Sequence, residues 1–338
     1  MPTYDVHAHV IVREALDEMR ASHPDHAPTL HESDGAYWLT YPGGRARLGP
    51  IPAGMFETEL RLADMDRQRV DIQLLSVAPP NYHYHVPAEV GDAFAQAQND
   101  AMVRMAEKQP DRFAVFATLP LQDPQLAVAE IARMAGHGLV RGVEIGTNVS
   151  KRNLDDPALE PVWAALADAD LPVWVHPDQR GIAGEERLSS YYLANLIGNP
   201  LETTIAMGAL IFGGVLERHP SLRFGFVHGG GFTPYQIGRW DHGWGCRPEP
   251  KAVVADVPPS EYFGRFFFDS LTHDPLSLEL LGRRVGWDHV VVGSDYPFDM
   301  ASDDPVGGVE KVDLTPEQRQ SVFEGNAVRF LRPMPDGS

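Results

Sequence analysis

The chain has 338 residues, of which 43% are hydrophobic, and it carries a single cysteine and a formal net charge of −19. This length and hydrophobic content suit one large α/β barrel or two ordinary domains with a substantial core. The acidic charge argues against nucleic acids and anionic membrane surfaces as partners, although local arginines can still bind a small anionic substrate. The lone Cys246 excludes an internal disulfide and a cysteine-based zinc cluster.

The beginning of the chain and its apolar stretches predict a cytoplasmic protein without a membrane span. Residues 1–5 lack the basic and apolar regions of a signal peptide. The longest nearly apolar stretch, residues 204–216, is too short to cross a bilayer and contains three glycines. We therefore expect no membrane partner.

The chain opens with a predicted strand over residues 4–10. His7 and His9 lie on one face of this strand, because alternate side chains of a strand share a face. A short helix over residues 13–22 follows. Residues 23–56 are rich in Pro, Gly and His and include a predicted hairpin at residues 37–44. We interpret them as a small insertion over the mouth of the first strand, since long irregular loops in compact domains are often functional lids.

Apolar runs with strand character then alternate with helical patterns. The further predicted strands cover residues 72–77, 113–119, 140–145, 172–176, 222–228, 266–270 and 289–293. The predicted helices cover residues 56–70, 87–108, 124–137, 157–169, 188–197, 201–218, 275–284 and 315–331, with another after the glycines at 229–231. Eight short strands, mostly separated by helices, predict a (β/α)8 TIM barrel formed by a single domain, residues 1–338, with the insertion at 23–56.

Five side chains that can bind metals or protons lie at or near the carboxyl ends of these strands. They are His7 and His9 of the first strand, His176 of the fifth, His228 of the sixth and Asp295 after the eighth. The active site of such a barrel lies at this rim, whereas random placement would scatter the residues over both rims. A single histidine at a strand end is usually structural, and Asp295 alone could be a turn or cap residue. The joint pattern predicts one active site.

Three neutral imidazoles and one carboxylate suit Zn²⁺ and also accept Mn²⁺ or Fe²⁺. We predict that His7, His9, His176 and Asp295 bind one divalent metal, with zinc as the expected ion. An open position would hold water, whose pKa the metal lowers toward neutrality. We predict that His228 is a general base or orients this water, because a nearby metal would keep it neutral.

Four further polar residues have open interpretations. Glu144, at the end of the fourth strand, points either into the barrel mouth or toward a helix; no lysine is present there to bridge a second metal. His273, after the seventh strand, either supports the metal ligands or merely starts a helix. Arg47 and Arg239 either bind a substrate carboxylate bidentately or are solvated surface residues.

Motifs along nearly the whole chain resemble the amidohydrolase superfamily (amidohydrolase-related family 2), and in particular its decarboxylase branch, typified by 2-amino-3-carboxymuconate 6-semialdehyde decarboxylase. The motifs lie at residues 5–9, 142–147, 175–177, 202–206, 213–215, 228–231, 238–239, 273–275 and 293–298. The resemblance implies one metal, usually zinc or manganese, the same four ligands, and a catalytic histidine at His228.

The resemblance also implies roles for residues that bind the substrate. An arginine matching Arg239 reaches into the neighbouring subunit's site, which implies a homodimer. A second arginine comes from the insertion, where Arg47 is the nearest match and Arg45 the alternative. Asn195 replaces a tryptophan that lines the pocket, and Glu144 replaces a glutamine; these departures imply a different substrate rather than a different reaction.

The predicted function is metal-dependent, non-oxidative decarboxylation of an unsaturated or aromatic carboxylic acid with an ortho hydroxyl, amino or oxo group. In one mechanism, hydroxide generated with His228 adds to the conjugated system; in another, the substrate chelates the metal and Asp295 or a neighbouring acid protonates the carbon. The alternative is a hydrolase or hydratase acting on a ring-cleavage product or lactone, since relatives on this fold do each of these. A barrel that only binds a ligand predicts metal binding without turnover.

Overall fold

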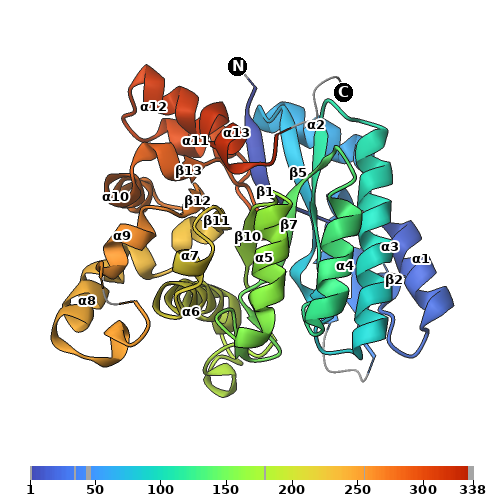
Figure 1. Cartoon of the computed structure of the whole chain (residues 1–338). Coiled ribbons are helices and arrows are strands. Elements are labelled where there is room, and N and C mark those ends of the chain that lie inside the picture. The colour runs from blue at the N-terminus through green and yellow to red at the C-terminus, as the bar shows by residue number, and fades with distance from the viewer. Residues whose placement is uncertain (1, 34–35, 43–46, 179, 255, 334–338) are drawn as a thin grey trace.

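The computed structural model describes residues 2–33, 36–42, 47–178, 180–254 and 256–333, and its main feature is a barrel of eight parallel strands (Figure 1). Both faces of such strands are covered, which accounts for their nearly continuous apolar sequences. The barrel confirms the predicted fold. In the order of the sheet, which is also chain order, the strands are β1 (Tyr4–Val10), β5 (Ile72–Val77), β6 (Phe113–Ala117), β7 (Val140–Gly146), β10 (Val173–His176), β11 (Phe224–Phe226), β12 (Phe267–Asp269) and β13 (Val290–Val291).

Main-chain hydrogen bonds between the first strand and the segment after the last bring the barrel almost to closure. Val6 N donates to Val292 O (3.0 Å), and His9 N donates to Tyr296 O (2.7 Å). The segment after β13 therefore lies along the carboxyl half of β1. This arrangement brings Asp295 beside the two histidines of the first strand.

Helices cover the outside of the barrel, and Figure 1 shows α3, α4 and α5 standing along its outer face. Within the described residues, every helix is too short or too polar to traverse a lipid bilayer. The α-helices are α1 (Arg13–Ser22), α2 (Thr58–Gln68), α3 (Ala88–Glu107), α4 (Pro124–Met134), α5 (Glu160–Asp168), α6 (Asn199–Phe212), α7 (Val215–Arg218), α8 (Thr233–Cys246), α9 (Pro259–Phe263), α10 (Pro275–Val285), α11 (Pro305–Glu310), α12 (Pro316–Gln320) and α13 (Asn326–Phe330). Short 3₁₀ segments are η1 (Ala53–Met55), η2 (Pro79–Tyr82), η3 (Pro157–Leu159), η4 (Glu185–Arg187), η6 (His228–Gly230), η7 (Glu249–Lys251) and η8 (Trp287–His289), and two π-helical segments are η5 (Ala194–Gly198) and η9 (Ser321–Gly325).

The prediction of a helix over residues 188–197 is wrong for most of its length. Tyr191 and Tyr192 have φ angles of 59° and 61°, and two successive residues in the left-handed region interrupt a right-handed helix. Helical structure begins only at η5. The single helix predicted over residues 315–331 is instead the run α12, η9 and α13.

Aromatic side chains fill the barrel interior. The rings of Trp174 and Phe116 stack with 6.2 Å between centroids, and Phe330 of α13 packs edge-on against Trp174 at 5.5 Å. Arg223, directly before β11, donates from Nε to Phe330 O (2.8 Å). Helix α13 therefore covers the amino-terminal end of the barrel, and the carboxyl end remains for the site.

A small antiparallel sheet lies within residues 23–56. It consists of β2 (Thr29–Ser33), β3 (Ala36–Thr40) and β4 (Arg47–Ile51). Buried Leu39 and Ile51 of this sheet belong to the same apolar cluster as Met19 of α1 and Phe94 of α3. A second, two-stranded hairpin, β8 (Asn148–Val149) with β9 (Arg152–Asn153), follows β7.

Candidate active site

The two histidines of β1 point into the barrel mouth beside Asp295. His7 and His9 are fully buried and lie two residues apart on one face of the strand. Their Nε2 atoms lie 3.3 Å and 3.2 Å from Asp295 Oδ1. Asp295 has a φ of 61°, and its backbone N donates to His7 O (2.8 Å). This conformation turns the carboxylate toward both imidazoles.

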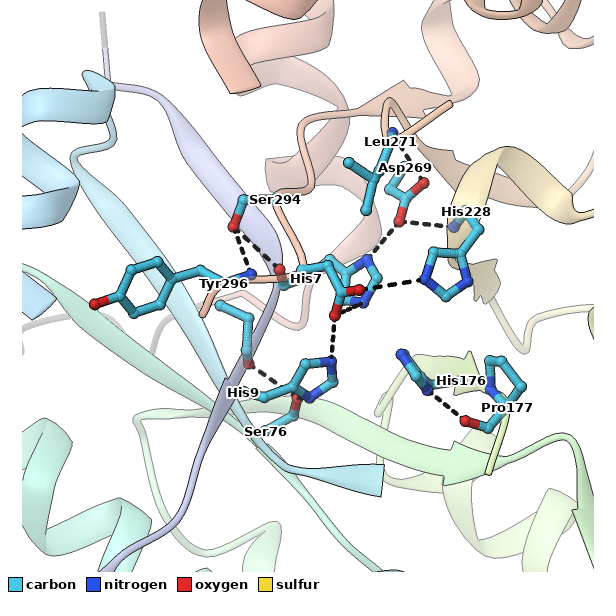
Figure 2. Close-up of polar contacts among 12 residues, drawn as sticks. His7, His9, Ser76, His176, Pro177, His228, Asp269, Leu271, Ser294 and Tyr296 are labelled. Carbon is cyan, nitrogen blue, oxygen red and sulfur yellow. Dashed lines mark hydrogen bonds and ion pairs between the residues drawn. The ribbon is translucent and has the colours of Figure 1, made fainter. Parts of the chain in front are cut away.

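The two later histidines complete the cluster, and Figure 2 shows His7, His9, His176 and His228 surrounding one point. The ring centroid of His176, at the end of β10, lies 4.8 Å from that of His9 and 5.1 Å from that of His7. The His228 centroid lies 5.3 Å from that of His176. Five residues predicted from four separate strands are thus brought together.

Hydrogen bonds fix the tautomers of three histidines. The Nδ1 atom of His9 lies 3.1 Å from Val77 O, and that of His176 lies 2.7 Å from Pro177 O. The Nδ1 atom of His7 lies 2.6 Å from the Asp269 carboxylate. Because carbonyls and carboxylates only accept hydrogen bonds, each neutral ring carries its proton on Nδ1 and keeps the lone pair of Nε2 free.

These lone pairs make a fitting metal site. The Nε2 atoms of His7, His9 and His176 and Oδ1 of Asp295 are buried and have no hydrogen-bond partner among the described residues. Buried polar atoms without partners are costly, and a cation between them would satisfy all four donor atoms. Ligand atoms of His7, His176, His228 and Asp295 also lie within 4.8 Å of one another, so distance alone leaves His9 and His228 as competing fourth ligands.

Asp269, at the end of β12, is a supporting residue that the sequence reasoning missed. Besides His7, its carboxylate accepts hydrogen bonds from the backbone N of His228 (2.9 Å), Gly229 (2.8 Å) and Leu271 (3.1 Å). Carboxylates that orient metal-binding histidines raise their basicity and fix their rings. A signal was present, because this strand also ends an apolar run with a carboxylate.

Asp5, the second residue of β1, anchors the strand to its neighbours. Its Oδ2 accepts hydrogen bonds from Ser294 Oγ (2.6 Å) and Gln73 Nε2 (2.9 Å). Gln73 Oε1 in turn accepts from Arg61 Nη1 (2.7 Å). Burial raises the pKa of Asp5 against the lowering effect of these bonds. The network ties β1, β5 and the turn after β13 together directly behind the histidines.

Burial and mutual charge shift the pKa values within the cluster in different directions. Burial and the neighbouring His9 and His7 hold the pKa of His176 well below its usual value. Burial alone would raise the pKa of Asp295, but His7 and His228 hold it well below its usual range. Burial opposes protonation of His7, but Asp295 and Asp269 raise its pKa to about 10. A divalent cation would compete with this proton for the same lone pair.

Glu144 and His273 occupy different surroundings. Glu144 is fully buried and accepts a hydrogen bond from Tyr82 OH (2.8 Å), with its Oε1 3.9 Å from His9 Nδ1. Burial raises the pKa of Glu144, and the charge of His9 opposes this rise. It therefore lies inward, behind His9. His273 is exposed and lines a separate hollow of about 250 Å³ beside α10, so it does not reach the cluster.

A cavity of about 520 Å³ opens over His176, His228 and Asp295. Asn195, predicted to contact substrate, is among its lining residues. Arg239 lies exposed on α8 and does not line it. Arg47 belongs to β4, but its side chain and the whole of Arg45 lie outside the described residues. The other lining residues are Tyr41, Leu48, Gly49, Pro50, Ile51, Pro79, Pro80, Pro177, Asp178, Arg180, Glu185, Tyr192, Asn199, Phe298, Asp299 and Met300.

A family model and curated relatives match most of the chain. Residues 4–332 match the family described as Amidohydrolase. A 2-amino-3-carboxymuconate-6-semialdehyde decarboxylase from Dictyostelium discoideum is 35% identical over 282 residues, covering 83% of this chain and 78% of the relative. The same enzyme from Caenorhabditis elegans is 30% identical over 379 residues, covering 97% and 93%.

A solved structure supports the fold. The 5-carboxyvanillate decarboxylase from Novosphingobium aromaticivorans, complexed with manganese and 4-hydroxy-3-methoxy-5-nitrobenzoic acid, aligns with a TM-score of 0.79. The alignment covers 97% of this chain and 95% of that chain at 20% identity. At this identity the similarity is evidence for the shared barrel.

Proposed function

The chain belongs to the amidohydrolase family, and on that premise we propose that it is a metal-dependent, non-oxidative decarboxylase of an unsaturated or aromatic carboxylic acid. The observation that carries the proposal is the convergence of three histidine lone pairs and one carboxylate in the barrel mouth. Two relatives that share 30% or more of their aligned residues with the chain are named as decarboxylases. Fold alone does not determine the reaction, so the cluster and these relatives both matter.

We propose His7, His9, His176 and Asp295 as the residues that hold one divalent metal. The free Nε2 atoms of the histidines and Oδ1 of Asp295 are the donor atoms. This donor set suits zinc, which we propose as the ion, and manganese is the alternative that a structural neighbour contains. When bound, such a metal polarises substrate oxygens or lowers the pKa of water.

His228 and Asp295 are the groups that we propose to hold and move protons. His228 Nε2 lies 3.6 Å from Asp295 Oδ2, and its Nδ1 has no hydrogen-bond partner among the described residues. Decarboxylation breaks the bond between a ring or chain carbon and its carboxylate, and the released electron pair needs a sink. Protonation of that carbon provides the sink, and loss of carbon dioxide then restores conjugation. Asp269 fixes the backbone of His228 for this role.

Residues of the insertion and of the segment after β10 are proposed to bind the substrate. Leu48 to Ile51 of β4 line the cavity, which supports Arg47 as a substrate residue of the insertion, with Arg45 as the alternative. Asn195 of η5, which follows β10 in the chain, also lines the cavity. We propose that its amide contacts the substrate directly.

We propose a homodimer in which Arg239 reaches the partner's cavity. Arg239 is exposed on α8, one turn beyond Tyr235, whose side chain is 77% exposed. Phe232 N donates to Thr204 Oγ1 (2.9 Å), which places the start of α8 against α6. Several large apolar side chains are exposed at the start of α8 and in the segment that leads into α6, and exposed apolar patches mark interaction sites. They are Tyr191, Tyr192, Leu196, Ile197, Phe232 and Tyr235.

Product analysis by mass spectrometry tests the proposed reaction. Metal-loaded protein is incubated with ortho-substituted benzoates and with aminocarboxymuconate semialdehyde, the acid named for the two relatives. We expect at least one acid to lose carbon dioxide without oxidation. Gain of water, with or without cleavage, would show that the protein is a hydratase or hydrolase that uses the same site.

We also propose that the protein is located in the cytoplasm, and cell fractionation tests this location.

A further inference from the structure

We propose that Arg180 binds a second anionic group of the substrate, so that the preferred substrates carry a carboxylate in addition to the one that departs. The inference rests on the proposed decarboxylase function and narrows its substrate class. Arg180 was not among the residues predicted from the sequence. It follows β10 by four residues, in the loop that begins after His176.

The cavity places Arg180 in a particular electrostatic setting. Among its described lining residues, Arg180 is the one lysine or arginine, whereas Asp178, Glu185 and Asp299 all contribute carboxylates. An anionic substrate that enters this cavity would be repelled by these carboxylates. The guanidinium is therefore the feature of the described lining that can attract a negatively charged group.

Neutral groups hold the guanidinium in place. Its carbon Cζ lies 4.5 Å from the ring centroid of Tyr41, in a cation–π contact. Arg180 Nη1 lies 2.6 Å from His85 Nδ1, which accepts the hydrogen bond because a guanidinium only donates. Tyr41 is itself fixed, since its OH donates to Asn81 Oδ1 (2.7 Å).

One face of the guanidinium lacks a partner. Arg180 Nη2 is buried without a hydrogen-bond acceptor among the described residues, and within the same residues Arg180 forms no ion pair. A buried donor without an acceptor costs free energy, and a charged donor costs more than a neutral one. A carboxylate oxygen of a bound substrate would remove this cost and neutralise the charge.

The cavity gives the two acid groups separate positions. The departing carboxylate has to lie beside His228 and Asp295, because the proton that replaces it moves there. Arg180 lies over Tyr41, which belongs to the insertion, between β3 and β4, rather than to the barrel strands. A substrate with a single acid group would satisfy one position only. A substrate with two acid groups would satisfy both.

Calorimetric titration with simple probes tests this assignment without requiring turnover. The metal-loaded protein is titrated with benzoate, which carries one carboxylate, and with phthalate, isophthalate and terephthalate, which carry two at different spacings. We expect at least one dicarboxylate to bind about tenfold more tightly than benzoate. Arg180→Gln should remove this preference. Arg187→Gln should retain it, because Arg187 lies exposed in the same loop and does not line the cavity.

The outcomes separate this inference from the proposed reaction. Absence of a dicarboxylate preference in the wild type, or its survival in Arg180→Gln, would overturn the role of Arg180 even if the protein decarboxylates an acid. Loss of the preference in Arg180→Gln would support it even if no tested acid loses carbon dioxide. If Arg180→Gln does not fold, Arg180→Lys decides: it cannot form a bidentate pair, and an undiminished preference would contradict the proposal.

Discussion

The four histidines of the cluster differ in what their two ring nitrogens contact. His7, His9 and His176 each commit Nδ1 to an acceptor and leave Nε2 free. His228 differs, because its Nδ1 has no partner among the described residues and its Nε2 faces Asp295 Oδ2. This difference favours three histidines as ligands and the fourth as the group that handles protons.

Replacement of His228 by alanine separates these roles. We expect His228→Ala to reduce turnover at least about 100-fold, because removal of a general acid or base has effects of this size. Metal content, measured by plasma mass spectrometry, should stay near that of the wild type. His273→Ala is the matched control and should remain active, since His273 is exposed outside the cavity. Full activity of His228→Ala, or loss of its metal, would refute the assignment.

The environment of His85, which contacts Arg180, predicts that the stability of the folded protein depends on pH. Partial burial, Arg180 and His26 lower the pKa of His85 from 6.5 to about 4. Between these two pKa values, such a group binds fewer protons in the folded chain than in the unfolded chain. Its contribution to the free energy of unfolding is therefore complete above pH 6.5 and decreases as the pH falls toward 4.

Comparison of the wild type with His85→Gln measures this contribution. Urea unfolding of both proteins between pH 7 and pH 4 gives the difference in their free energies of unfolding. We expect that difference to change in favour of His85→Gln as the pH falls, because glutamine does not titrate. A difference that is constant over this range would show that His85 keeps an ordinary pKa.

The secondary-structure elements show which parts of the fold were predictable. Strand β5 and helix α1 have the boundaries that apolar periodicity predicted, because such patterns report directly on buried faces. Residues 191–192 could not be predicted in the same way, because their left-handed φ angles depend on the surroundings and not on periodicity. Strand β11 ends at Phe226, before the predicted His228, since His228 and Gly229 to Gly231 all have positive φ.

The site was more predictable than the elements that support it. Strand alternation and apolar runs predicted the five clustered residues because their chemistry is visible at strand ends. Asp269 was missed although it ends an apolar run like the other site residues, because its contacts with His7 and His228 are visible only in the folded chain. Arg180 was missed for the same reason, since its contacts with Tyr41 and His85 join segments distant in sequence.

Helix α13 makes a testable contribution to stability at the amino-terminal end of the barrel. Phe330 is fully buried against Trp174 and Phe267, with ring centroids 5.5 Å and 5.0 Å away. We expect Phe330→Ala to lower the free energy of unfolding by about 3–5 kcal/mol, measured by urea denaturation. Val328→Ala in the same helix is the control and should cost much less, because Val328 is 49% exposed. Equal costs for the two variants would contradict the packing role of α13.

At the scale of the whole molecule, the proposed dimer can be tested by complementation. His228→Ala and Arg239→Ala should each be inactive as separate homodimers. If Arg239 serves the partner's site, a mixed dimer contains one complete site, and an equal mixture that exchanges subunits should recover about a quarter of wild-type activity. No recovery after demonstrated subunit exchange would show that Arg239 acts within its own chain or has no role in catalysis.

The measurement that most directly tests the metal-dependent decarboxylase assignment is carbon dioxide release before and after removal of the metal. The protein is treated with a chelator, assayed with the acid on which it is most active, and assayed again after addition of zinc or manganese. We expect chelation to abolish carbon dioxide release, and about one bound metal per chain to restore it in the wild type but not in His176→Ala. Undiminished carbon dioxide release by metal-free protein would contradict the assignment.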